Sequence, residues 1–197
     1  MGRLINIFMG MACAAIGLTG CAAHVSAPVP RADVVLDQQS RCLTDAEIAQ
    51  WVRSYTQRQS FDNPPAAMQA ADAACTRAKY QQQLARVAGP LVGYKVDLSN
   101  LHLQKTFHAG EPVWGSYYQS MLLPAQQGPV DVRYGSQPVF LANLLVRVSD
   151  AGINDAQTAE DVLLHIDQIV PFIELADLQV QKPSGLTAHH LTAINAA

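Results

Sequence analysis

Apolar positions recur at helical spacing soon after residue 41. In the segment LTDAEIAQWVRSYTQRQ they follow an i, i+3, i+4, i+7 pattern, at Ile48, Trp51, Val52 and Tyr55. Thr44 and Glu47 stand before them at the spacing of a capping box, in which each side chain accepts a hydrogen bond from the other residue's backbone N–H. The pattern predicts an amphipathic helix that begins after Thr44.

A second helix is predicted beyond Pro64 and Pro65, which break the chain. The segment AAMQAADAACTRAKYQQQLARV is rich in Ala, Gln and Arg, which are good helix formers. One stripe at near-helical spacing carries Met68, Ala71, Cys75 and Ala78. The composition and this stripe together predict an amphipathic helix.

The pattern changes at Gly89, where the apolar runs become short, β-branched or aromatic and are separated by Gly, Pro and Asp. Strands are predicted over residues 91–96, 120–123, 139–148 and 169–178. Thr158 and Asp161 can cap a further helix, AEDVLLHIDQI, between the last two strands. The chain from 41 to 197 is therefore predicted to be one α+β domain, helical over 41–88 and β-rich over 89–197.

Residues 1–20 have the pattern of a signal peptide, with Arg3 as the only charged residue before an apolar run too short for a comfortable membrane span. The run ends in LTGC, which resembles the bacterial lipobox. That resemblance implies a lipid on Cys21 that anchors the protein, with residues 21–40 as a tether. Ala22 after the cysteine favours the outer membrane, facing the periplasm of the cell envelope. An ordinary signal peptide or an uncleaved anchor is the alternative.

Charge limits the partners of the chain, and its cysteine content agrees with export. The formal net charge is −3 at pH 7, which argues against a nucleic-acid partner. Of the four cysteines, Cys13 lies in the predicted signal and Cys21 in the lipobox. Cys42 and Cys75 remain as one even pair, which predicts a disulfide in an oxidising compartment. Two buried free thiols are the alternative.

The run VPFIELADLQV places two carboxylates, Glu174 and Asp177, among apolar residues. A carboxylate removed from water must be paired, bind a cation or stay protonated.

Elsewhere, His189 and His190 are predicted to be solvated because no third metal ligand stands at a suitable spacing. The aromatic cluster around Trp114 is predicted to pack in the core or to line an apolar pocket.

From about residue 91 onward the chain resembles the 2-keto-4-pentenoate hydratase group of the fumarylacetoacetate hydrolase superfamily. The matching pieces are VGYKVDLSN, GEPVWGSYYQSMLLP, PVFLANLLVRV, AEDVLLHIDQIVPFIELAD and INAA. The resemblance implies a fumarylacetoacetate-hydrolase-like domain after the helices. It also implies a hydro-lyase that adds water to a 2-hydroxydienoate to give a 4-hydroxy-2-oxo acid. Mg²⁺ or Mn²⁺ on three carboxylates is implied as cofactor, with Glu174 as one ligand and Lys95 as the catalytic lysine.

The chain departs from that family at the metal. Two ligands are expected from an E-x-E on one strand, since residues i and i+2 point to the same face. Here those positions are Leu141 and Asn143, which cannot supply anionic oxygen. The departure predicts weak or absent activity and leaves Glu174 and Lys95 either as a residual site or as an inert ion pair.

Two functions remain open. One is a hydratase-like lyase, a degenerate family member, that acts on a small 2-oxo acid. The alternative is a non-catalytic envelope lipoprotein that uses the scaffold for binding or assembly. The sequence ends where the family continues through further strands, so the β-rich core is expected to be incomplete at the C-terminus. A sheet edge left open in this way favours a homo-oligomer.

Overall fold

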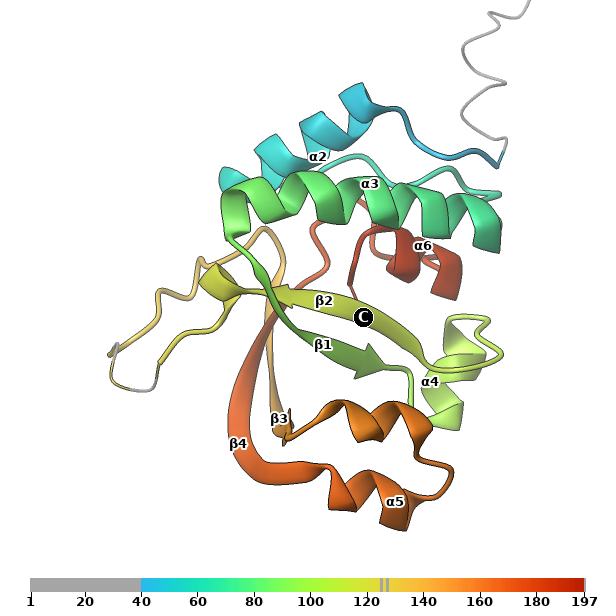
Figure 1. Cartoon of the computed structure of the whole chain (residues 1–197). Helices are drawn as coiled ribbons and strands as arrows, with labels where there is room; N and C mark the ends of the chain where they lie inside the picture. The colour runs from blue at the N-terminus through green and yellow to red at the C-terminus, as the bar shows by residue number, and fades with distance from the viewer. Residues whose placement is uncertain (1–39, 125, 127, 197) are drawn as a thin grey trace, which may run out of the picture.

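The computed structural model describes residues 40–124, 126 and 128–196 (Figure 1). The predicted signal peptide over 1–20 and the lipidation of Cys21 lie outside the described residues, as does the tether apart from residue 40. Within the described part, no helix is long and apolar enough to cross a membrane. Three helices lie on one side of a first hairpin, and a second hairpin extends away from this body (Figure 1).

Helix α2 (Asp45–Thr56) begins where the sequence predicts it. The Thr44 side chain accepts from the backbone N–H of Glu47, and the Glu47 carboxylate accepts from the backbone N–H of Thr44, so the capping box is complete. Arg41 donates twice to the same carboxylate, which lowers the pKa of Glu47 to about 2. The helix buries Ile48 and Trp51 on its inner face.

Helix α3 (Ala70–Ala88) also forms, but its buried stripe is not the predicted one. The buried residues are Ala73, Thr76, Tyr80, Leu84 and Ala88, whereas Ala71, Cys75 and Ala78 are exposed. Several stripes of this Ala-rich helix are apolar, and the one with the two large side chains, Tyr80 and Leu84, gains most from burial.

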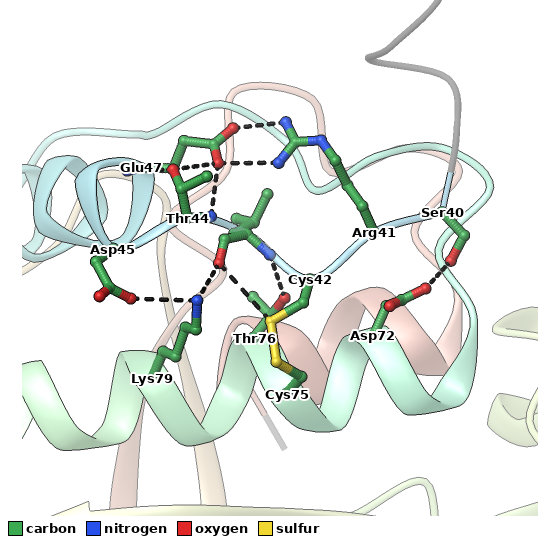
Figure 2. The surroundings of a disulfide bond; sticks show 11 residues. Ser40, Arg41, Cys42, Thr44, Asp45, Glu47, Asp72, Cys75, Thr76 and Lys79 are labelled. Carbon is green, nitrogen blue, oxygen red and sulfur yellow. Dashed lines mark hydrogen bonds and ion pairs between the residues drawn. A yellow bond between two sulfur atoms is a disulfide. The ribbon is translucent and has the colours of Figure 1, made fainter.

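Cys42 and Cys75 form a disulfide, with the sulfur atoms 2.03 Å apart and the Cα atoms 5.6 Å apart (Figure 2). The pair is the one expected from the sequence. It joins the segment before α2 to the exposed side of α3. Beside it, the backbone N–H of Leu43 donates to the Thr76 hydroxyl over 3.0 Å and Lys79 donates to the Leu43 carbonyl over 3.0 Å. The start of the domain is therefore tied to α3 both covalently and by hydrogen bonds.

The first hairpin pairs β1 (Leu91–Asp97) with β2 (Val113–Tyr118), and the short helix α4 (Leu101–Thr106) lies between them. β1 is confirmed as predicted. The strand predicted over 120–123 is wrong: a 3₁₀ turn, η1 (Gln119–Met121), begins there, and the strand is the preceding VWGSYY. The apolar and polar residues of β2 do not alternate with a period of two. Helices cover one face of the strand and the pocket described below lies on the other, so both faces are partly buried.

The second hairpin pairs β3 (Pro138–Val148) with β4 (Ile166–Asp177) in antiparallel register, with Leu141 opposite Glu174. Between them lie a 3₁₀ turn, η3 (Ala151–Asp155), and helix α5 (Ala159–Leu164), which Thr158 and Asp161 cap as predicted. We call residues 138–177 the arm. Figure 1 shows the arm leaving the body and ending in α5 at its far end. No described residue from 121 to 179 is buried.

The hydrophobic core lies in the body, between α2, α3, β2 and the segment that ends in α6 (Ala188–Ala193). Trp51 stacks on Phe61 with ring centroids 4.5 Å apart, and Tyr80 meets Trp51 edge-on at 5.7 Å. Burying a side chain of this size contributes about 2 to 3 kcal/mol each. The β-rich half predicted over 89–197 thus also contains three short helices, and its longest strands lie outside the core.

His190 on α6 is buried, which overturns its expected solvation. Its Nδ1 accepts from the backbone N–H of Thr187 over 3.1 Å, so Nε2 carries the hydrogen and donates to the Pro65 carbonyl over 3.1 Å. The neutral imidazole therefore links α6 to the segment before α3. The sequence predicted solvation because it shows no partner for His190. The partner is a backbone carbonyl 125 residues away.

Candidate functional site

Lys95 and Glu174 come together although they belong to different hairpins. Lys95 is on β1 and Glu174 on β4, and the Lys95 Nζ lies 3.8 Å from Glu174 Oε1. Lys95 also donates to the Ala196 carbonyl over 3.1 Å. The structure thus pairs the two residues that the sequence singled out, at the point where the arm leaves the body.

The Glu174 carboxylate receives two further donors. The Tyr117 hydroxyl donates to Oε1 over 3.2 Å, and the Asn143 amide donates to Oε2 over 3.0 Å. Tyr117 comes from β2 and Asn143 from β3, so three other strands supply partners to one carboxylate. Both oxygens of Glu174 are therefore occupied by donors from within the chain.

Burial shapes the electrostatics of the two residues that face Glu174. Removal from water lowers the pKa of Lys95, and the nearby charges of Glu174 and Asp97 only partly oppose this. Burial raises the pKa of Tyr117, and the negative charge of Glu174 raises it further. Tyr117 therefore stays protonated at any physiological pH and donates its hydrogen to Glu174.

A pocket of about 920 Å³ lies beside this cluster. Lys95, Tyr117 and Glu174 line it together with apolar residues of β4 and of the loop before the arm, such as Phe172 and Leu123. A volume of this size accommodates a small organic ligand. The cluster and the pocket together combine an apolar enclosure with a few convergent polar groups.

The fold of the chain is shared with proteins of known structure. The chain matches two structures of a protein from Pseudomonas putida G7, each at 20% identity and over 80% of this chain. The fold is similar to that of 4-oxalocrotonate decarboxylase. One structure, complexed with magnesium and adipate, gives a TM-score of 0.67, and the other, complexed with calcium and acetate, gives 0.62. The decarboxylase is an enzyme of the fumarylacetoacetate hydrolase superfamily.

The likeness confirms the expected fold type and leaves the hydratase activity a prediction. This chain spans 62% and 61% of the lengths of the two decarboxylase chains. No protein-family model and no curated protein sequence matches it.

The residues present do not fit the divalent metal that the superfamily implies. The register sets Leu141 directly opposite Glu174, and Asn143 hydrogen-bonds to Glu174, so both expected ligand positions do lie beside it. Leu141 offers no oxygen, and Asn143 turns its amide N–H toward the carboxylate. Among the described residues, no group of three or more His, Cys, Asp or Glu side chains could hold a metal ion. The strands that should carry the metal ligands are therefore paired as expected, but two of the three expected carboxylates are replaced.

The other singled-out residues have structural partners. The Asp177 carboxylate accepts from the backbone N–H groups of Ser136 and Gln137 over 2.8 and 2.7 Å, which fixes the loop that enters β3. In the aromatic cluster, Tyr118 is buried in the core and Trp114 is half exposed under the Arg77 guanidinium, 3.7 Å from the ring centroid. Asp177 and Trp114 therefore stabilise the fold and do not contact Glu174.

The sequence did not single out Asn195, which holds the end of the chain against β2. Its side chain accepts from the backbone N–H of Ser116 over 2.8 Å and donates to the Ser116 carbonyl over 3.1 Å. This contact fixes the adjoining Ala196 carbonyl to which Lys95 donates. A polar residue inside the apolar INAA run was the available signal.

Proposed function

We propose that the protein is a non-catalytic binding protein of the bacterial cell envelope that takes a small 2-oxo acid into the pocket beside Lys95. The observation that carries the proposal is the Lys95–Glu174 pair on the pocket wall, combined with Leu141 and Asn143 at the positions where a metal site needs carboxylates. The scaffold is related to that of an enzyme, but the ligand set that would do metal chemistry is absent from these positions.

The charges of the cluster suit an anionic ligand. Glu174 is neutralised by Lys95 and by the hydrogen bonds from Tyr117 and Asn143, so it repels a carboxylate only weakly. The Lys95 ammonium has three N–H donors, of which one is directed to Ala196 and one to Glu174. The third is available to a ligand carboxylate, and the apolar lining of the pocket suits the hydrocarbon part of a small acid.

The proposed location rests on the N-terminal sequence and on the disulfide. Residues 1–20 and the LTGC run support export and a lipid on Cys21, with the domain facing the periplasm from the outer membrane. The Cys42–Cys75 disulfide is compatible with an oxidising compartment.

Calorimetric titration with pyruvate, as the simplest 2-oxo acid, tests the proposal. We expect binding that EDTA does not change, because no metal takes part. Lys95→Met should weaken it at least about tenfold, since a charge-assisted hydrogen bond contributes roughly 1.5 to 3 kcal/mol. Lys105→Met, which removes an exposed lysine on α4, is the matched control and should bind as the parent does. Equal binding by Lys95→Met and the parent would refute the proposed site.

A residual hydro-lyase is the second proposal, and it is favoured by the burial of Lys95, which lowers the pKa of a lysine on a pocket wall beside a protonated tyrosine. Titration with Mg²⁺ and Mn²⁺, beside a Glu174→Gln variant, separates the two proposals. The binding protein should bind neither ion in either form. Metal binding that Glu174→Gln abolishes, together with metal-dependent consumption of 2-hydroxypenta-2,4-dienoate, would instead establish the lyase.

A further inference from the structure

One face of the β3–β4 hairpin carries an uninterrupted run of apolar pairs, bounded at one end by the Pro138–Asp177 pair. Residues paired across antiparallel strands share a face, and four consecutive pairs on this face are apolar on both strands. They are Phe140 with Leu175, Ala142 with Ile173, Leu144 with Pro171, and Val146 with Ile169. We call these eight residues the outer face. The opposite face of the same hairpin carries Glu174 and Asn143. The pocket is lined by β4 residues of both faces, Glu174 on the opposite face and Pro171, Ile173 and Leu175 on the outer face.

The outer face is open to solvent. Seven of its eight residues are exposed and Leu175 is half-buried. The largest exposed fractions are 79% for Phe140, 68% for Ile173 and 64% for Leu144. A two-stranded hairpin is only marginally stable by itself in water. Monomeric proteins also rarely expose contiguous apolar patches larger than a few hundred Å². A covering partner would therefore stabilise the arm by removing this apolar surface from water.

We propose that this partner is a second copy of the chain and that two outer faces stack about a twofold axis. A twofold contact requires a surface that is complementary to itself. The outer face meets this requirement because it has no charged residue, so stacking brings no like charges together. Two sheets stacked face to face lie about 10 Å apart, which apolar side chains of this size fill.

The charges around the outer face favour a second copy over a membrane. The Arg147–Asp167 pair flanks one end and Asp177 the other, so neither end has a net positive charge to meet acidic lipid. The whole chain has a net charge of −3, which opposes an anionic lipid surface further.

The size of the face sets the expected strength of the dimer. Full burial of an aliphatic or aromatic side chain removes roughly 60 to 120 Å² of apolar surface. With the exposed fractions given above, the outer face buries on the order of 400 Å² per copy, or about 800 Å² for the pair, which is below the roughly 1,000 Å² of a stable interface and in the range of weak, transient complexes. We therefore expect a reversible dimer that dissociates in the micromolar range.

Sedimentation velocity of the full chain between about 1 and 100 µM tests the proposal. The parent should change from monomer to dimer over this range. Ile173→Glu should remain a monomer throughout, because stacking would bury a charge and weaken the dimer by roughly 100-fold or more. The matched control is Val132→Glu, at a valine of the loop before β3 that is 78% exposed and lies off the outer face. It should dimerise as the parent does. Since all samples share the same N-terminal segment, a difference between them reports the outer face.

A second variant distinguishes loss of the dimer contact from misfolding of the arm. Ile173→Thr keeps a β-branched residue in the strand, and its far-UV circular dichroism should match that of the parent while its dimer is weakened. A parent that is monomeric at 100 µM would overturn the proposal, as would Ile173→Glu dimerising like Val132→Glu. Vesicles of phosphatidylethanolamine and phosphatidylglycerol that bind the parent but release Ile173→Glu, with no dimer in solution, would overturn it in favour of a lipid surface.

Discussion

At the scale of single residues, the buried polar side chains of this protein obtain their partners from distant parts of the chain. Among the described residues, no buried side-chain nitrogen or oxygen lacks a hydrogen-bond partner. Asn195 bonds to Ser116, and His190 bonds to Pro65, 125 residues away. Leaving such a group unpaired costs about 1 to 3 kcal/mol. Substitutions at these positions are therefore expected to act on stability through long-range contacts.

His190 should make stability depend on pH. Burial lowers the pKa of His190, and a positive charge on His189 would lower it further. As the pH falls, His190 therefore takes up a proton in the unfolded chain at a higher pH than in the folded chain. The free energy of unfolding should therefore fall as pH drops below the unfolded value of about 6.5, by at most about 1.4 kcal/mol per pH unit. Urea unfolding of the parent and of His190→Gln between pH 7.5 and 5 measures this dependence.

In His190→Gln the side-chain amide can still donate to the Pro65 carbonyl, but it does not titrate, so the slope below pH 6.5 should decrease. His102→Gln, at an exposed histidine on α4 away from His190, is the matched control and should keep the parent's slope. Equal slopes in all three proteins would show that His190 takes up its proton as readily in the folded state as in the unfolded state.

The sequence singled out two residues of the candidate site at this scale. It singled out Lys95 and Glu174, and the possibility that they pair is confirmed by the 3.8 Å contact. It could not anticipate the hydrogen bond from Tyr117 to Glu174, because that contact depends on how two separate hairpins are placed against each other. Hydrophobic periodicity specifies which face of an element is buried, and carries no information on the distance between two sheets.

At the scale of elements, the same local device stabilises two helices whose surroundings differ. Thr44 caps α2 and Thr158 caps α5, each with a complete capping box. α2 packs into the core, whereas α5 has no buried residue. Thr44→Ala should lower the free energy of unfolding by about 1 kcal/mol. Thr158→Ala should change it by less than about 0.5 kcal/mol, because the loss of α5 exposes no core.

Urea denaturation followed by tryptophan fluorescence measures this pair of variants, since Trp51 lies in the core. A loss in Thr158→Ala equal to that in Thr44→Ala would contradict the expected independence of the arm's tip.

Elements with strong local signals were predictable, and those defined by their surroundings were not. β1 and β3 occupy nearly the residues expected, and the cap of α5 was correct. β4 begins three residues earlier than predicted, within the segment assigned to the α5 helix, because the hairpin register continues to Ile166. β2 was missed since its burial follows from contacts on both faces.

At the scale of the whole molecule, the disulfide restricts the unfolded chain as well as the folded one. Cys42 and Cys75 are 33 residues apart, and closing a loop of that size removes about 3 to 4 kcal/mol of unfolded-state entropy in the chain-entropy model. Reduction, or the double substitution Cys42→Ala and Cys75→Ala, should lower the free energy of unfolding by about that amount. Guanidinium unfolding with and without reductant measures it. The double variant should be insensitive to reductant, and an unchanged midpoint for the reduced parent would contradict the expectation.

The position of the core in the sequence bears on how the chain folds. The core draws on residues 43–118 and again on 180–194, so the arm is topologically an insertion within the body. Before the last segment can dock, the chain must close a loop of about 60 residues, at an entropic cost of roughly 3 to 4 kcal/mol. If the β3–β4 hairpin forms first, fewer flexible residues remain in the loop that must close. We therefore expect the arm, which adds no buried residue to the core, to speed folding by bringing the two halves of the core together.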